Sequence, residues 1–173
     1  MKFKQLAVLP LILINSAVFA GERTVVIHSI NESGVSSAIG SINLSDSDNG
    51  LVLTPSLKGL SAGLHGIHIH TNPSCDAAMK DGKSVAGLAA GGHYDPNSSN
   101  KHEGPVGAGH NGDLPALLVN ADGEANTAIT APRLKVADII NLAIIIHEGG
   151  DNYSDTPKPL GGGAGRIACG IIK

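Results

Sequence analysis

GLHGIHIH, residues Gly63 to His70, is the most informative stretch of this 173-residue chain. Its run of β-forming residues predicts a strand, and residues two apart in a strand face the same side of the sheet. His68 and His70 are therefore expected side by side, at a spacing where one metal ion can bind both rings. Neutral imidazole suits copper and zinc better than calcium or magnesium.

A lone pair of histidines at this spacing is often incidental, but this pair is not alone. Five more potential ligands follow along the chain: His93, His102, His110, Asp113 and His147. Seven candidate ligands in one small chain predict a metal centre.

The rest of the sequence predicts strands rather than helices. Short apolar runs bounded by turn residues predict strands at 24–30, 36–44, 51–57, 64–70, 114–119, 124–130, 142–147 and 166–172. Asn120-Ala121-Asp122-Gly123 is a turn sequence, because Asp-Gly tolerates positive φ. Residues 133–140 allow one short helical turn. Regularly spaced short strands of this kind are typical of an antiparallel sandwich or barrel.

Two long segments interrupt the strands. Residues 71–113 and 148–165 are rich in Gly, Pro, Asn and Ser and have little strand character. Long irregular loops in a compact domain are usually functional or disordered. Because these two loops hold or adjoin nearly all the histidines, we expect them to be functional.

The first twenty residues read as a secretory signal. Lys2 and Lys4 precede an apolar core at 6–14, and Val18-Phe19-Ala20 offers a small-residue cleavage site. The alternative is a membrane anchor, but nine apolar residues interrupted by Pro10 are too short to span a bilayer. We expect cleavage near Ala20, export and one mature domain at 21–173.

Composition narrows the possible partners. Removing the two signal lysines moves the formal charge from −3 to about −5. The mature chain has no basic run and no Trp, and its aromatic residues are Tyr94 and Tyr153. These features predict no nucleic-acid partner, and no membrane contact once the signal is removed. Protein interfaces favour aromatic anchors, so we expect a monomer or a weak homodimer.

Cys75 and Cys169 are the two cysteines of the chain. A single pair in an exported protein meets an oxidising compartment and forms a disulfide by default. The alternative is two buried free thiols.

Five spaced motifs together resemble one family. They are residues 65–70 (HGIHIH), 92–96 (GHYDP), 101–105 (KHEGP), 109–114 (GHNGDL) and 164–170 (AGRIACG). Their order and spacing resemble the copper,zinc superoxide dismutases, in particular the bacterial periplasmic branch. The resemblance covers essentially all of the mature chain.

This resemblance implies a fold and an activity. The fold would be an all-β, eight-stranded Greek-key barrel, an immunoglobulin-like sandwich, with two long functional loops. The activity would be disproportionation of superoxide into oxygen and hydrogen peroxide at a copper redox centre, with one copper and one zinc per subunit.

The same resemblance implies a role for each site residue. The copper ligands would be His68, His70, His93 and His147. The zinc ligands would be His93, His102, His110 and Asp113, with His93 bridging the two metals. Arg166 would be the arginine beside copper, Cys75 and Cys169 the intrachain disulfide, and Asp151 a hydrogen-bond link between one copper and one zinc histidine.

Residue chemistry agrees with these roles. Three imidazoles and one carboxylate form a closed N₃O set, as expected of structural zinc. Arg166 stays charged and offers several donors to an oxygen anion, although an arginine there could also be a surface charge at the barrel edge. For His65, off the face of His68 and His70, we expect a hydrogen bond inside the fold.

Two other functions fit part of the pattern. A periplasmic protein that binds or delivers copper or zinc would explain the histidines. Delivery of Cu(I) favours soft Met and Cys ligands, however, and the mature chain offers Met79 and two cysteines expected to be paired. An adhesion module of immunoglobulin type would explain the strands but not the histidines.

Overall fold

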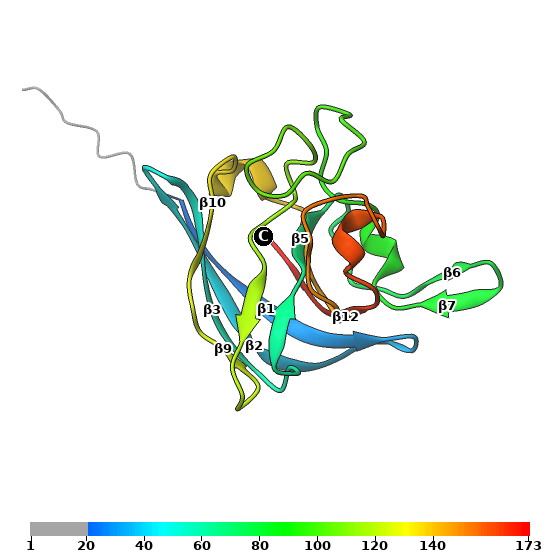
Figure 1. Cartoon of the computed structure of the whole chain (residues 1–173). Helices are drawn as coiled ribbons and strands as arrows, with labels where there is room; N and C mark the ends of the chain where they lie inside the picture. The colour runs from blue at the N-terminus through cyan, green and yellow to red at the C-terminus, as the bar shows by residue number, and fades with distance from the viewer. Residues whose placement is uncertain (1–20) are drawn as a thin grey trace, which may run out of the picture.

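The computed structural model describes residues 21–173, and the predicted signal at 1–20 lies outside the described residues. The regular secondary structure of the described part is almost entirely antiparallel strands, which curl around an apolar core (Figure 1). None of its helices is long and apolar enough to cross a membrane.

The main sheet has eight strands, with β10-β3-β2-β1-β12-β11-β5 in lateral order and β9 also paired to β3. Their bounds are β1 Glu22–Asn31, β2 Gly34–Ser47, β3 Gly50–Lys58, β5 Ile67–His70, β9 Glu124–Ala125, β10 Ile129–Ala131, β11 Ala143–His147 and β12 Arg166–Ile171. A separate pair joins β4 (Gly63–His65) to β8 (Leu117–Val119). This curled antiparallel sheet agrees with the predicted barrel-type sandwich.

Alternation of side chains along β5 separates the core from the face that carries the histidines. Ile67 and Ile69 are buried in the main apolar cluster, together with side chains from β1, β2, β3 and β12. His68 and His70 point to the opposite face, because neighbouring residues of a strand alternate sides. On β11, Ile144 belongs to the main cluster. The strand that carries the first two histidines is thus fixed by the core on its other face.

The predicted strand at 64–70 is interrupted at Gly66, which separates β4 from β5. The N–H of Gly66 donates to the carbonyl of Gly149 at 2.7 Å, and its own carbonyl accepts from the N–H of His147 at 2.8 Å. A Cβ at this position would lie 3.2 Å from Cε1 of His68. Glycine lets the chain approach both the ring and the next loop closely.

The two long loops carry more local structure than the sequence analysis predicted. Between β5 and β8 the chain forms the hairpin β6 (Ala78–Lys80) and β7 (Lys83–Val85), which projects from the body (Figure 1), and a 3₁₀ turn, η1 (Leu88–Ala90). The loop after β11 contains the 3₁₀ turn η3 (Leu160–Gly162). The helical turn predicted within 133–140 is confirmed as the 3₁₀ segment η2 (Val136–Ile139).

Two predicted strands differ from the structure. The strand predicted at 124–130 is two short strands, β9 and β10, which pair with different parts of β3. The strand predicted at 114–119 begins only at Leu117.

Candidate metal centre

Seven predicted ligands form two groups that share one residue. The first group is His68, His70, His93 and His147, and the second is His93, His102, His110 and Asp113. In each group the candidate ligand atoms lie within 4.8 Å of one another. All seven side chains are buried, and His93 belongs to both groups.

Strand pairing brings the first group together. In the register of β5 and β11, His68 lies opposite Ile145 and His70 opposite Ala143. His147 ends β11, and a bulge in the pairing with β12 sets it opposite Arg166. Such bulges re-aim a side chain where pairing ends.

The long loop reaches the same place by pairing with the free edge of β5. The N–H of Tyr94 donates to the carbonyl of Ile69 at 2.8 Å, and the N–H of Ile69 donates to the carbonyl of Gly112 at 2.9 Å. Isolated bridges also join His70 to His93 and His68 to Asp113. Pairing with β5 therefore places the loop ligands beside the strand ligands, and it covers an edge that would otherwise be open.

The second group converges on one carboxylate oxygen. Oδ1 of Asp113 lies 2.9 Å from Nδ1 of His93, 3.0 Å from Nδ1 of His102 and 3.3 Å from Nδ1 of His110. Burial alone would raise the pKa of Asp113, but hydrogen bonds from His102 and His93 outweigh it and hold the pKa well below its usual range. Three imidazole nitrogens and one carboxylate oxygen that lie this close together form a donor set that suits a tetrahedral cation.

Asp151 links the two groups. Its Oδ2 lies 2.7 Å from Nε2 of His68, and its Oδ1 lies 2.8 Å from Nε2 of His102. The N–H of Tyr153 also donates to Oδ1 at 2.7 Å. These contacts leave Nδ1 of each histidine facing its own group, because each ring uses Nε2 for the carboxylate.

Several ring nitrogens have no hydrogen-bond partner among the described residues although they are buried. They include His68 Nδ1, His70 Nε2, His93 Nε2 and His147 Nε2. Each unsatisfied buried nitrogen costs about 1–3 kcal/mol, and native proteins leave few of them. The four belong to the first group, so a metal ion bound there would satisfy them all. The donor set thus fits a copper site, as the second group fits a zinc site.

The histidines of the site differ in their affinity for protons. Burial, and then the neighbouring His68, lower the pKa of His147 to about 3. Burial also lowers the pKa of His93 to about 4, because it outweighs the hydrogen bond to Asp113. Burial also acts to lower the pKa of His102, but hydrogen bonds to Asp113 and Asp151 outweigh it and raise the pKa to about 9. In the first group the rings are therefore neutral and ready to bind metal at neutral pH.

Other hydrogen bonds orient the histidines. Nδ1 of His65 donates to the carbonyl of His147 at 2.7 Å, so the internal hydrogen bond predicted for His65 is confirmed. Nδ1 of His70 donates to the carbonyl of Gly91 at 2.9 Å and leaves Nε2 free. Fixing one ring nitrogen in this way sets both the tautomer and the direction of the other nitrogen.

Arg166 lines a cavity of about 440 Å³ together with two of the histidines, His93 and His147. Its guanidinium donates to the carbonyls of Gly87 at 2.6 Å and Gly91 at 2.8 Å. Burial lowers its pKa, yet an arginine remains charged at any working pH. The structure thus places Arg166 in the cavity wall rather than at an exposed barrel edge.

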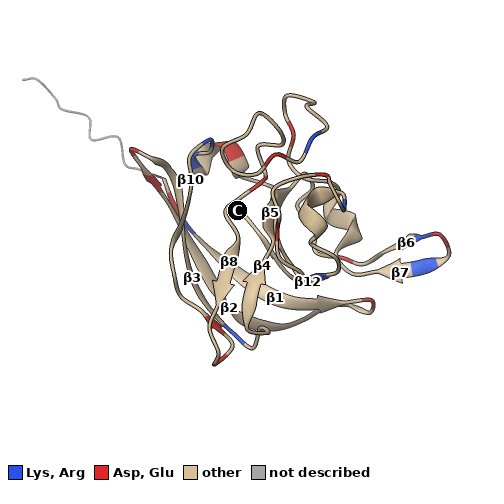
Figure 2. Cartoon of the chain, viewed as in Figure 1, with Lys and Arg blue, Asp and Glu red and all other residues tan. Residues whose placement is uncertain are grey.

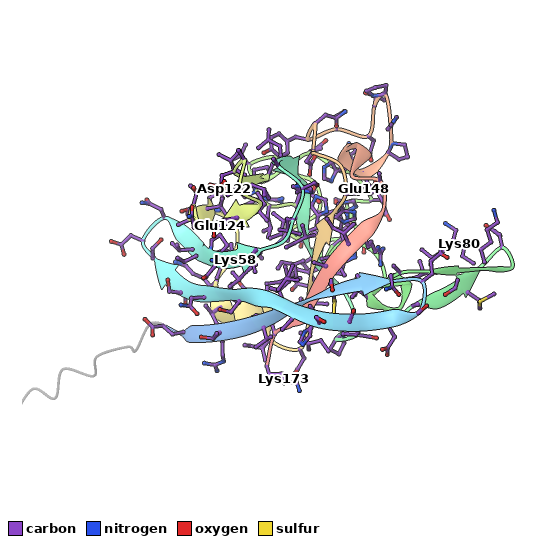
Figure 3. All side chains as sticks on the ribbon, turned by 90° about the horizontal axis from the view of Figure 1, so that it is seen from below. Lys58, Lys80, Asp122, Glu124, Glu148 and Lys173 are labelled. Atoms are coloured by element: carbon purple, nitrogen blue, oxygen red, sulfur yellow. A yellow bond between two sulfur atoms is a disulfide. The ribbon has the colours of Figure 1, made fainter. Side chains whose placement is uncertain are left out.

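One lysine also lines this cavity. Lys158 is part of its wall. Lys58 instead pairs with Glu124 at 2.9 Å, and Figure 3 shows both near Asp122 and away from Glu148, the neighbour of His147. Figure 2 shows Lys and Arg interspersed with Asp and Glu along loops and hairpin ends, with no continuous basic stripe.

Cys75 and Cys169 form a disulfide, with their Cα atoms 5.6 Å apart, and both are buried. This confirms the predicted pairing and excludes two free thiols. The bond ties the long loop to β12, three residues beyond Arg166.

Sequence reasoning missed Arg133, which supports the loop that carries the second group. Its guanidinium donates to the carbonyl oxygens of Gly104, Pro105, Gly109 and His110. A single arginine that binds several carbonyls in this way holds a loop that has little secondary structure of its own. Nothing in the sequence around Arg133 pointed to these carbonyls.

Comparison with known proteins agrees with this geometry. The sequence pattern of the family described as "Copper/zinc superoxide dismutase (SODC)" matches residues 38–172. The chain is 52% identical over 174 residues to "Superoxide dismutase [Cu-Zn]" of Escherichia coli K12, covering 100% of both chains. It is 60% identical over 137 residues to the protein of the same name from Pasteurella multocida, covering 78% of this chain and 74% of the relative.

Solved structures agree as well. Cu/Zn superoxide dismutase from Brucella abortus superposes with a TM-score of 0.87 at 46% identity, covering 88% of this chain and 100% of the other. The monomeric copper, zinc superoxide dismutase from Salmonella enterica superposes with a TM-score of 0.80 at 52% identity, with the same coverage.

Proposed function

The chain belongs to the copper/zinc superoxide dismutase family, and from this membership we propose how its own residues share the work. It is an enzyme that converts superoxide into oxygen and hydrogen peroxide, with copper and zinc as cofactors. The observation that carries the assignment of residues is the sharing of buried His93 between two groups of ligand atoms.

We assign copper to the first group and zinc to the second. His68, His70, His93 and His147 would hold one copper ion, and His93, His102, His110 and Asp113 one zinc ion. Support for the copper assignment comes from the unpartnered nitrogens of the first group, which are imidazoles without a thiolate. Support for zinc comes from the N₃O donors around Asp113.

Copper, when bound, supplies the one-electron oxidation and reduction that the reaction needs. Arg166 binds the superoxide anion in the cavity beside His147, because its planar guanidinium stays charged and offers several donors. Hydrogen bonds to Gly87 and Gly91 hold that guanidinium in place before substrate arrives. Preorganised donors of this kind stabilise the negative charge that grows as peroxide forms.

His93 is suited to hold a proton for the peroxide. Its Nδ1 is engaged with Asp113 at 2.9 Å, and its Nε2 has no hydrogen-bond partner and belongs to a residue that lines the cavity. Disproportionation consumes protons as peroxide forms. Nε2 is also the nitrogen that this ring would offer to copper, so we propose that it takes up one proton only while it does not hold copper, and then releases that proton to the product.

We further propose that the chain acts in the periplasm as a mature domain at 21–173, after cleavage of a signal near Ala20. The Cys75–Cys169 disulfide supports an oxidising compartment, and the relatives named above come from bacteria. Function in metal delivery has less support, since both cysteines are bonded and Met79 lies on the exposed β6–β7 hairpin.

The proposed oligomeric state is a monomer or a weak homodimer. The relative from Salmonella enterica is described as monomeric. Leu64 and Leu118 are exposed and lie opposite each other in the β4–β8 pair, and this small apolar patch offers a site for at most weak self-association. We propose superoxide as the substrate and no nucleic-acid or membrane partner.

The test is to purify the chain from an export host and measure metals and activity together. We expect one copper and one zinc per chain and rapid removal of superoxide. Removal of copper should abolish the activity, and restoring copper should return it. Superoxide removal by the copper-free protein at the rate of the loaded protein would contradict the proposal.

A further inference from the structure

The carboxylate of Asp155 joins two loops that serve different parts of the site. Its Oδ2 accepts a hydrogen bond from the backbone N–H of His102 at 2.9 Å. Its Oδ1 accepts one from the backbone N–H of Leu160 at 3.0 Å. The bond from His102, and then that from Leu160, lower the pKa of Asp155, so the carboxylate is charged at neutral pH. A charged acceptor makes both bonds stronger than neutral ones.

On one side, this carboxylate reaches the zinc group. The ring of His102 lies with Nδ1 3.0 Å from Asp113 and Nε2 2.8 Å from Asp151. Its side chain is thereby fixed in the ligand cluster. A bond to the backbone N–H of the same residue is therefore anchored to a residue whose side chain is held at both ring nitrogens.

On the other side, the carboxylate reaches the wall of the cavity. Leu160 begins η3 and lines the cavity with Lys158, Pro159 and Arg166. Its φ is 54°, in the left-handed region that non-glycine residues occupy only when surrounding contacts hold them there. Asp155 supplies such a contact at the first residue of the turn.

The next residue shows how closely this wall lies against the ligands. A Cβ at Gly161 would lie 2.1 Å from Oδ1 of Asp151 and 2.7 Å from Nε2 of His102. The N–H of Gly161 also donates to the carbonyl of Ser154 at 3.0 Å. Small movements of the ligand cluster and of the cavity wall are thus coupled by contact, with Asp155 as a side-chain link between them.

We propose that Asp155 is a positioning residue for the cavity beside Arg166, which we call the substrate channel. Asp155 holds the wall formed by Lys158, Pro159 and Leu160 at a fixed distance from the ligand cluster. The inference rests on the proposed ligand assignment. When zinc fixes His102, Asp155 transmits that order to Leu160, so the channel keeps the width and the lysine position that a small anion requires. Asp155 itself does not touch the substrate.

Charge and positioning predict opposite effects of removing Asp155. Loss of a negative charge near the channel should speed the approach of an anion. Loss of the two hydrogen bonds should release the wall and slow productive binding. Asp155→Asn and Asp155→Ala remove the same charge, but the asparagine keeps one acceptor oxygen. Comparing the two therefore isolates the hydrogen bonds.

Asp122→Asn, in the turn between β8 and β9, removes a charge away from the channel and is the matched control.

The experiment uses each protein loaded with copper and zinc, with metal content verified. It measures azide affinity at copper by optical titration, amide exchange of residues 156–164 with and without zinc, and kcat/KM for superoxide. We expect full metal content in all variants. Asp155→Ala should lose about three- to tenfold in both azide affinity and kcat/KM, Asp155→Asn should lose less, and Asp122→Asn should match the wild type.

Amide exchange tests the coupling directly. Zinc removal should speed exchange at Leu160 strongly in the wild type, and much less in Asp155→Ala, where the link is already broken. Equal zinc effects in both proteins would overturn the proposal, as would a gain in kcat/KM in both Asp155 variants or loss of zinc from them. A wild type that binds both metals but has no dismutase activity would instead contradict the proposed function, whatever the variants show.

Discussion

Oδ1 of Asp113 lies 2.9 Å from Nδ1 of His93, so the one ring shared by both ligand groups is oriented by a residue of the second group. The unpartnered Nε2 of His93 is then left for the first group. Asp113 thus acts on both groups, directly on one and through His93 on the other. The effects of losing ligands should therefore be unequal.

Removing one ligand from each group should separate the two metals. His147→Ala should abolish activity and weaken copper while zinc stays bound, because His147 lies outside the second group. Asp113→Ala should lower zinc occupancy and the thermal midpoint first, with a secondary loss of copper through misorientation of His93. Elemental analysis of both purified variants checks this. Equal loss of both metals from each variant would refute the division.

Zinc binding should release about one proton at pH 7.5. The pKa of His102 is raised to about 9 in the metal-free protein, because the pull of Asp113 and Asp151 outweighs burial. The ring is therefore protonated at pH 7.5 and must lose that proton to bind zinc through Nδ1. Zinc affinity should consequently rise with pH up to about 9.

Calorimetric titration of zinc into metal-free protein, in two buffers with different enthalpies of ionisation, counts the protons released. Asp151→Asn is the matched control, because loss of its charge should lower the pKa of His102 and the proton count with it. Zinc binding without proton release in the wild type would show that His102 is neutral before the metal arrives.

The disulfide should support both stability and activity. It joins the loop to β12 close to Arg166, and closing a loop of this length stabilises a fold by roughly 4–5 kcal/mol in the chain-entropy model. Cys75→Ser should lower the unfolding midpoint and also reduce activity per bound copper. Thermal unfolding with and without reductant checks the first effect. If the wild type unfolded at the same temperature with and without reductant, the disulfide would contribute nothing to stability.

Lys158 and Lys58 provide a matched pair for testing electrostatic attraction. Lys158 lines the cavity, whereas Lys58 pairs with Glu124 elsewhere. Lys158→Gln should lower kcat/KM by about twofold or more at low salt, and the difference should shrink as salt increases. Lys58→Gln should leave the rate unchanged. Equal effects of the two substitutions would point to net charge rather than to the position of Lys158.

Much of the site was predictable because it depends on local spacing. In β5, alternation puts Ile67 and Ile69 into the core and His68 and His70 on the other face, and that pattern is legible in four residues. The cysteine pairing followed from there being two cysteines in a chain expected to be exported. The regular recurrence of short apolar strands pointed to an antiparallel sandwich or barrel, and the family resemblance implied the Greek-key barrel.

Features that depend on distant contacts were not predictable. Gly66 ends β4 because its N–H and carbonyl bond to Gly149 and His147, more than eighty residues away. Arg133 binds carbonyls of the zinc loop, which present no side-chain signal. The β6–β7 hairpin is a different case. Its turn contains Asp81-Gly82, both at positive φ, but the flanking residues lack the apolar alternation by which strands are recognised.

Arg166 gives the most demanding test of the mechanism. If it binds superoxide, its loss should reduce kcat/KM while both metals stay bound, since it belongs to neither ligand group. Arg166→Lys keeps the charge but loses the planar fork held by Gly87 and Gly91, so it should retain more activity than Arg166→Ile.

Added salt should slow the wild type, because attraction between charges is screened over about 10 Å at 0.1 M. That slowing should be weaker in Arg166→Ile, where part of the attracting field is gone. Pulse radiolysis across a salt series, on samples of verified copper content, measures both quantities. If Arg166→Ile matched the wild type in rate and salt slope, the guanidinium would have no part in binding superoxide.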